Sequence, residues 1–178
     1  QPAWIRPSAD FEQALLARAQ SGERGIWLLT SPSERAHMLA RLGTPVAFVG
    51  SVGEDVWGRY CLDDMASRGI DLSRVLRGGG LKTGVTVSIT HPLDRALVTY
   101  LGAIGALTAA DVPDAAMAGL DHLHASSFFF QEGLRPGFPD LFARARRAGL
   151  TTSLDTGFDP SGRWDGGLRE TLRETDLF

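Results

Sequence analysis

Two glycine-rich segments are the first places in this sequence where chemistry on a phosphate could occur. GSVGEDVWG spans residues 50–58, and RGGGLKTG spans residues 77–84. A dinucleotide site needs the spacing G-x-G-x-x-G, and a P-loop has a glycine directly before its lysine. The glycines of the first segment are spaced differently, and a leucine precedes the lysine of the second. Glu54 and Asp55 would also put negative charge where a phosphate must sit. The sequence therefore disfavours a phosphate loop at either place.

The acidic pair has a simpler interpretation as the start of a helix. Trp57, Cys61 and Met65 follow it at a spacing of four residues, which is typical of one helical face. A carboxylate at the first turn favours the positive end of the helix dipole, and glycines permit a sharp turn from strand to helix. We therefore predict that Asp55 caps a helix that runs to Arg68, rather than taking part in catalysis directly.

Other polar side chains come at the ends of apolar segments that are typical of strands. HLHAS is followed by Ser127, and TTSLD ends with Asp155. Ligands bind beyond the carboxyl ends of strands in an open α/β sheet. Ser126 and Ser127 are therefore candidates for contact with a substrate, or they are ordinary polar loop residues. Asp155 could orient a substrate or an ion, or it could only cap the turn at DTG.

The histidines and the cysteine point to no metal site or triad. His122 and His124 alternate along one segment and so face one side, but no third ligand follows at a metal-site spacing. A catalytic serine elbow, G-x-S-x-G, is absent from the sequence. Cys61 is the only cysteine, so an intrachain disulfide is excluded. We predict no bound metal from these residues.

Composition narrows the class of protein further. The 178 residues carry a net charge of −3 with scattered arginines, which disfavours a nucleic-acid partner. No apolar run approaches the roughly 20 residues that cross a bilayer, and the amino-terminal residues lack the pattern of a signal peptide. The sequence therefore predicts a cytoplasmic protein with no membrane partner.

Apolar segments and helical patterns alternate along the chain with short connections. Helices are predicted over residues 8–22, 31–43, 55–68, 109–118, 139–149 and 164–174. Strands are predicted over 25–29, 45–50, 122–126 and 151–155, with a last apolar piece at 176–178. This alternation indicates parallel strands joined by right-handed crossovers. Residues 83–102 interrupt it and predict a β-hairpin with a loop of five or six residues, a candidate for a separate subdomain.

Five segments, in order, resemble the amino half of the ribokinase-like (PfkB) carbohydrate kinases. The first is LARLGTPVAFVGSVGEDVWGRYCLDDMASRGIDLSRV, in which five residues stand at the family's spacing: Gly43, Gly53, Asp55, Gly58 and Gly69. KTGVTVSIT, TYLGAIGALTAADV, LHASSFFF and SLDTGFDPSGRW follow. The resemblance covers about residues 39 to 178.

The sequence departs from the family's pattern at several places. Thr30 to Pro32 stand where glycines are expected, and Glu34 stands where the family has an asparagine. Ile104 occupies a second asparagine position. The family's Asn-Glu dyad and its Gly-Ala-Gly-Asp motif, which carries the catalytic base, would follow Phe178 and are not among these residues.

The resemblance implies an α/β fold: a ribokinase-like three-layer sheet with helices on both faces and a small β-hairpin lid. Residues 1–82 and 103–178 would form an incomplete α/β domain that lacks its carboxyl half, and residues 83–102 would form the lid. The implied activity is ATP-dependent phosphorylation of a hydroxymethyl group on a sugar or sugar derivative. This chain would carry the substrate side. ATP and Mg²⁺ are implied as cofactors, with the donor site and the catalytic base outside these residues.

The expected sugar contacts follow from the same resemblance and from the strand ends. Tyr100, Thr83 and Glu34 join Ser127 and Asp155 as candidates for binding the substrate. A lone strand tyrosine such as Tyr100 is also typical of a half-buried strand position. The resemblance further implies a homodimer that pairs through the lid, and it does not select one sugar.

Two alternatives remain open on the sequence alone. One is a non-catalytic sugar-binding or interaction module, or a truncated kinase fragment, because the base is not among these residues. The other is a nucleotide-dependent oxidoreductase on a doubly wound sheet, which would need the glycine fingerprint that is lacking. A fluorescence titration with NAD or NADP tests the second alternative.

Overall fold

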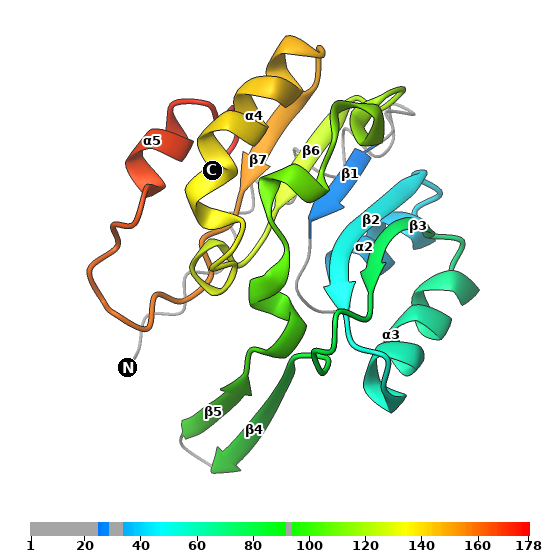
Figure 1. The fold of residues 1–178 in the computed structure, drawn as a ribbon, viewed down its shortest axis with the longest axis vertical. Helices are drawn as coiled ribbons and strands as arrows, with labels where there is room; N and C mark the ends of the chain where they lie inside the picture. Colours follow the sequence, from blue (N-terminus) through cyan, green and yellow to red (C-terminus); the bar gives the residue numbers. More distant parts are fainter. Residues whose placement is uncertain (1–24, 29–33, 92–93) are drawn as a thin grey trace.

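The computed structural model describes residues 25–28, 34–91 and 94–178 of the chain (Figure 1). The side chains of residues 25–35, 38 and 88–97 are not part of that description. The helix predicted over residues 8–22 lies outside the described residues.

A five-stranded parallel sheet forms the centre of the fold, in the order β3-β2-β1-β6-β7. Its strands are β1 (Gly25–Leu28), β2 (Val46–Val52), β3 (Asp71–Arg77), β6 (His122–Ala125) and β7 (Thr151–Leu154). The predicted α/β class with parallel strands is confirmed. Strand β3 was not predicted, because its exposed and half-buried residues give no clean apolar pattern. The last apolar piece adds only a parallel bridge between Ser153 and Leu177.

In the described ranges, four α-helices connect or flank these strands. They are α2 (Glu34–Arg41), α3 (Val56–Ser67), α4 (Phe138–Arg147) and α5 (Leu168–Leu172). The four predicted helices at these places are confirmed, although α5 is shorter than residues 164–174. Gly166 and Gly167 precede it with positive φ angles of 71° and 91°, which a helix cannot include.

The helix predicted over residues 109–118 is wrong. The chain forms two short 3₁₀ turns there, η2 (Ala109–Asp111) and η3 (Asp114–Met117). Pro113 separates them, because its ring lacks an N–H group and clashes with the preceding turn of a helix. The described part of the chain has three further 3₁₀ turns in its loops: η1 (Gly102–Ala106), η4 (Phe128–Phe130) and η5 (Arg135–Gly137).

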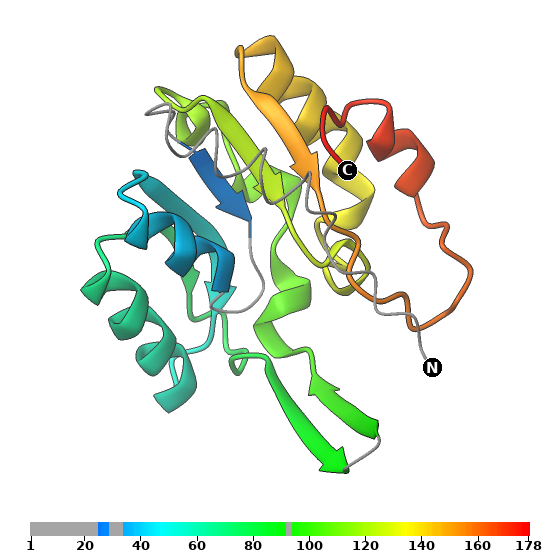
Figure 2. The ribbon, with the colours of Figure 1, turned by 180° about the vertical axis from the view of Figure 1, so that it is seen from behind.

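A hairpin of two long strands stands apart from the main sheet. Strand β4 (Val85–His91) pairs with β5 (Asp94–Tyr100) in antiparallel register, with His91 opposite Asp94. The predicted hairpin is confirmed, but the predicted loop of five or six residues is wrong, since the strands continue closer to the turn. Figures 1 and 2 show the hairpin projecting beyond the carboxyl ends of the sheet strands.

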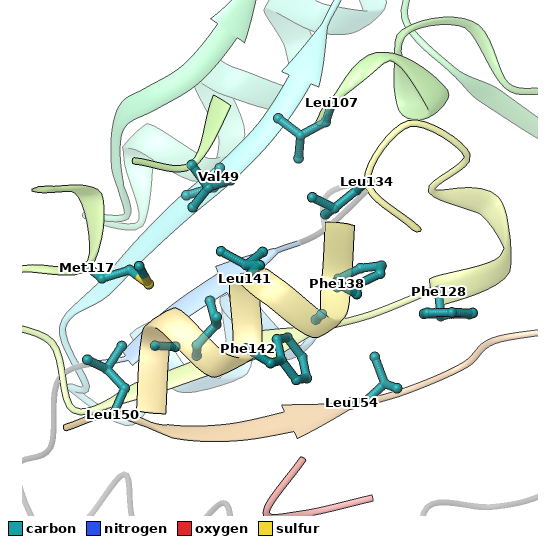
Figure 3. Packing of buried hydrophobic residues seen from close by; sticks show 14 of the residues in the cluster. Val49, Leu107, Met117, Phe128, Leu134, Phe138, Leu141, Phe142, Leu150 and Leu154 are labelled. Atoms are coloured by element: carbon teal, nitrogen blue, oxygen red, sulfur yellow. The ribbon is translucent and has the colours of Figure 1, made fainter. Parts of the chain in front are cut away.

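Two apolar clusters cover the sheet because alternate residues of β2 point to opposite faces. On one face Ala47 and Val49 pack with α4, whose four fully buried residues are Phe138, Leu141, Phe142 and Ala145 (Figure 3). On the other face Val46 and Phe48 pack with α2 and α3. Figures 1 and 2 show α4 and α2 on opposite sides of the strands.

One arginine holds the two 3₁₀ turns against α4. Arg144 donates from Nη1 to Asp114 at 2.6 Å and to the Val112 carbonyl at 2.9 Å. Its Nη2 donates to the Ala109 carbonyl at 3.0 Å, and its Nε donates to Asp140 at 3.0 Å. The Arg144 side chain is only 18% exposed, and its bonds to the two carbonyls are partly buried, whereas both aspartates are exposed.

We expect Arg144→Met to lower the free energy of unfolding by about 2 kcal/mol, because two carbonyls near the protein surface lose a charged donor. Urea unfolding followed by circular dichroism measures the change. Arg147→Met is the matched control, since Arg147 is exposed on the same helix and has no salt bridge within the described part of the chain. Equal effects of the two substitutions would contradict the assigned role.

Candidate functional site: the carboxyl ends of β6 and β7

The polar residues predicted at two strand ends come together in the structure. Ser126 follows β6 and donates from Oγ to Asp155 Oδ2 at 3.2 Å. Asp155 follows β7, and its Oδ1 accepts from the Gly157 amide at 3.1 Å. The Phe128 amide donates to the Asp155 carbonyl at 3.3 Å. Gln131, which sequence reasoning did not single out, donates from its buried side chain to the Ser126 carbonyl at 2.7 Å. These bonds fix both loops into one polar rim.

Ser127 has a backbone conformation that serine seldom adopts. Its φ of 59° and ψ of 45° lie in the left-handed region. Such strain costs of order 1 kcal/mol or more and is concentrated at ligand sites. Gly157 packs closely here, because a Cβ on it would lie 3.2 Å from Ser127 Cα. Among the described residues, the Ser127 hydroxyl has no hydrogen-bond partner, so it is available to a ligand.

Tyr100 lies on the hairpin at this end of the sheet. It is the last residue of β5 and is 56% exposed. It shares a face with Val85, which it opposes, and with the opposed pair Val87 and Val98. Within the described residues it makes no hydrogen bond to the rim. The structure therefore brings Ser127 and Asp155 together, whereas Tyr100 lies at the same end of the sheet with no hydrogen bond to either among the described residues.

Thr83 and Asp55, which are far apart in the sequence, are directly bonded. The Thr83 amide donates to Asp55 Oδ2 at 2.7 Å, and the Thr83 hydroxyl donates to Asp55 Oδ1 at 2.7 Å. The same hydroxyl accepts from the Gly53 amide at 2.9 Å. Thr83 is 7% exposed. Its polar groups thus serve the protein itself, and its predicted contact with a sugar stays a prediction.

The predicted helix cap at Asp55 is confirmed. Asp55 is the N-cap of α3, and its Oδ1 accepts from the Gly58 amide at 2.9 Å. Hydrogen bonds from the Gly58 amide, the Thr83 hydroxyl and the Thr83 amide lower the pKa of Asp55 to about 2 from its ordinary 3.8. Sequence reasoning missed the link to Thr83, because no local pattern connects two residues in different segments.

This pKa predicts a pH dependence of stability. A carboxylate whose pKa falls on folding stabilises the native state above its unfolded pKa of 3.8, and this contribution is lost as the pH falls towards about 2. Melting temperatures should therefore be lower for Asp55→Asn than for wild type near neutral pH, and the difference should shrink below about pH 4. Asp63→Asn, at an exposed position of the same helix, is the control and should show no such trend. A difference that stays constant with pH would contradict this expectation.

Glu34 is the first residue of α2, and its side chain lies outside the described part of the structure. Its predicted role therefore stays a prediction. None of the helices in the described ranges has both the length and the apolar character that crossing a bilayer requires.

The two histidines belong to a buried hydrogen-bond network. Ser153 Oγ lies 2.7 Å from His122 Nε2 and 2.7 Å from His124 Nδ1. His122 Nδ1 lies 2.7 Å from the Thr151 hydroxyl. The described residues contain no group of three His, Cys, Asp or Glu side chains that could hold a metal ion. The amino end of α3, where a phosphate could bind, is taken by the Asp55 carboxylate. The residues described here therefore do not fit Mg²⁺ and a nucleotide phosphate.

Comparisons with known proteins give this geometry its context. An ATP-dependent ribose-1-phosphate kinase of Halopiger xanaduensis is 31% identical over 157 residues, covering 85% of this chain and 48% of that protein. An uncharacterized sugar kinase of Archaeoglobus fulgidus is 25% identical over 142 residues, covering 79% of this chain and 55% of the relative. The chain thus spans about half the length of the curated relatives that it matches.

A solved structure shows the same arrangement of elements. The fructokinase of Xylella fastidiosa with bound ATP matches with a TM-score of 0.69 and 25% identity, over 80% of this chain and 48% of that one. Residues 35–178 match the sequence model of the pfkB family of carbohydrate kinases. On this match, this chain belongs to the pfkB family of carbohydrate kinases.

Proposed function

We propose that the chain is the substrate-side half of a carbohydrate kinase, which phosphorylates a hydroxymethyl group of a sugar or sugar derivative at the expense of ATP. Its ribokinase-like fold would be a three-layer α/β domain formed by residues 1–82 and 103–178. Residues 83–102 would be a lid over the sugar. ATP and Mg²⁺ are the proposed cofactors, with a donor site outside the described residues.

The observation that carries this proposal is the polar rim at the carboxyl ends of β6 and β7. Asp155 and Ser126 are bonded there, and the Ser127 hydroxyl next to them has no hydrogen-bond partner among the described residues. Ligands of open α/β sheets bind at this edge. A sugar presents several hydroxyl groups, which a carboxylate accepts from and a serine hydroxyl can both accept from and donate to. We propose Ser127 and Asp155 as direct sugar contacts.

The hairpin would supply the other side of the sugar site. Phosphoryl transfer depends on positioning the acceptor and excluding water from the reacting groups. Tyr100 stands at the foot of the hairpin, with 56% of its surface exposed, and could pack its ring on a sugar face or donate its hydroxyl to it. In this scheme the chain binds, orients and covers the sugar.

The hairpin also offers a surface for a second copy of the chain, and we propose a homodimer through it. Val87 and Val98 are directly opposed, and they are 56% and 58% exposed. An exposed pair of β-branched residues on one face of a two-stranded sheet is typical of a surface that another sheet covers.

We expect Val87→Lys to convert the dimer to a monomer, because the charged ammonium group would be buried in the apolar contact. Sedimentation velocity measures the change. Thr86→Lys is the matched control, since Thr86 is exposed on the other face of the same strand. A wild-type protein that is monomeric at tens of micromolar, or a T86K that dissociates equally, would refute pairing through this face.

The kinase proposal is tested with the full-length protein that contains this chain. A panel of pentoses, hexoses, sugar acids and nucleosides is incubated with Mg·ATP, and ADP release is followed by a coupled assay. We expect release that depends on one class of sugar. Sugar binding by calorimetry without ADP release would favour the non-catalytic binding module, and binding of NAD or NADP would favour the oxidoreductase.

A further inference from the structure

We propose that Asp55 is the positioning residue of the hairpin: by holding Thr83 through both of its carboxylate oxygens, it sets the orientation of residues 85–100 relative to the sheet. This inference rests on the proposed lid role of the hairpin and goes beyond the capping of α3. Asp55 and Thr83 together are called the clamp below.

The clamp uses more of the carboxylate than a helix cap requires. A cap needs one side-chain oxygen to accept a backbone amide of the first turn, and Asp55 Oδ1 accepts from Gly58 at 2.9 Å. Oδ2 has no part in that cap and accepts from the Thr83 amide at 2.7 Å. Oδ1 also accepts from the Thr83 hydroxyl at 2.7 Å. The carboxylate therefore binds the first residue of the hairpin segment from two directions.

Both legs of the hairpin meet at the clamp. The Ala103 amide, which follows the second leg, donates to the Lys82 carbonyl at 2.8 Å, one residue before Thr83. Gly102 lies so close that a Cβ on it would overlap the Lys82 carbonyl oxygen. Gly84 is packed in the same way, since a Cβ there would overlap the Ile104 side chain. The feet of both strands thus form one unit, and this unit is attached to α3 by Asp55.

Among the described residues, the strands of the hairpin have few other contacts that could hold their orientation. In the described residues β4 and β5 pair only with each other, as a two-stranded sheet. An isolated two-stranded ribbon is marginally stable in water and gains its order from what it is attached to. Val87 and Val98, further along it, are more than half exposed. The direction in which the hairpin points is therefore set at its foot.

Asp55→Asn separates the clamp from the cap. Asparagine is as good an N-cap as aspartate, so its one side-chain oxygen can still accept from Gly58. Its amide nitrogen is a donor and would face the Thr83 amide or hydroxyl, where the carboxylate had accepted. Thr83→Val removes the hydroxyl from the other partner, and Thr83→Ser is the conservative control that keeps it.

Hydrogen exchange followed by mass spectrometry on the folded full-length protein tests the proposal. We expect amides of residues 85–100 to exchange at least about tenfold faster in D55N and T83V than in wild type. The increase should be much smaller in peptides from β2 and α4 than in the hairpin, and T83S should resemble wild type throughout. Unchanged exchange of the hairpin amides would overturn the proposal. An equal increase in every peptide would overturn it too, because that result is expected if Asp55 only caps α3 and stabilises the whole fold. Should D55N fail to fold, the comparison of T83V with T83S decides in the same way.

The exchange experiment needs no sugar, so its failure differs from a failure of the proposed kinase function. Faster exchange confined to the hairpin in a protein without kinase activity would keep the clamp and reject the kinase. In an active protein, a misdirected lid should raise KM for the sugar by about tenfold in T83V and leave T83S near wild type. Wild-type KM in T83V together with slow hairpin exchange would reject the clamp and keep the kinase.

Discussion

Gly53→Ala should lower the free energy of unfolding by about 3 kcal/mol, because the new methyl group has no space. A Cβ on Gly53 would lie 2.5 Å from the Leu81 carbonyl oxygen and 2.5 Å from the Thr83 amide nitrogen. Both are backbone atoms and cannot turn aside as a side-chain end could. The segment before β4 would have to move away from Gly53, and this movement would break the bonds between Thr83 and Asp55. Urea unfolding and the exchange of hairpin amides measure the two consequences.

Gly105→Ala is the control for this substitution. A Cβ on Gly105 would meet nothing closer than Glu132, at 3.8 Å, which is ordinary contact. Its free energy of unfolding should stay within about 0.5 kcal/mol of wild type. If Gly53→Ala were equally mild, the close approach of the hairpin foot to the end of β2 would be wrong.

The elements that sequence alone could predict share one property: their pattern is local. Strand β2 begins with an unbroken apolar run over residues 46–50, all of them buried, and α3 begins after a capping aspartate and ends before Gly69. Helix α4 buries one apolar stripe under the sheet (Figure 3). Periodicity and capping are properties of neighbouring residues, so they could be read without knowing the fold.

The elements that could not be predicted depend on tertiary surroundings. Strand β3 is at the edge of the sheet, where its burial is incomplete and its apolar alternation is weak. Pro113 interrupts the helix predicted over residues 109–118. The two 3₁₀ turns that form there instead are held by Arg144, which lies on α4. The conformation of residues 109–118 is thus determined by backbone hydrogen bonds and one arginine, and these produce no periodic pattern in the sequence.

The candidate site divides in the same way. The rule that ligands bind at strand ends led to Ser127 and Asp155, and the structure brings these two together. The place of Thr83 at the start of the hairpin predicts a sugar contact, whereas its bonds to Asp55 depend on the tertiary fold. A sequence shows which residues are polar, but the partner of each hydroxyl group is a matter of three dimensions.

Asp155→Ala should reduce kcat/KM for the sugar by about 100-fold in the full-length protein, if the proposed kinase activity holds. The carboxylate is proposed to contact the sugar, and it also accepts from Ser126 Oγ at 3.2 Å and from the Gly157 amide at 3.1 Å. Its removal would take away a charged acceptor and release the loop that carries Ser127. A shift of about 1 Å in a bound acceptor is enough for such a loss of rate.

Two further substitutions separate these effects. Ser126→Ala removes the hydrogen bond between the two loops and keeps the Asp155 carboxylate. It should therefore lower kcat/KM only about tenfold if that carboxylate contacts the sugar directly. Asp165→Ala, at an exposed position in the same loop that takes part in none of the rim's hydrogen bonds, should leave the kinetics unchanged. Melting temperatures of all three variants show whether each is folded. A folded D155A with wild-type kcat/KM would mean that Asp155 only caps its turn, and the sugar would then have to bind elsewhere on this sheet edge.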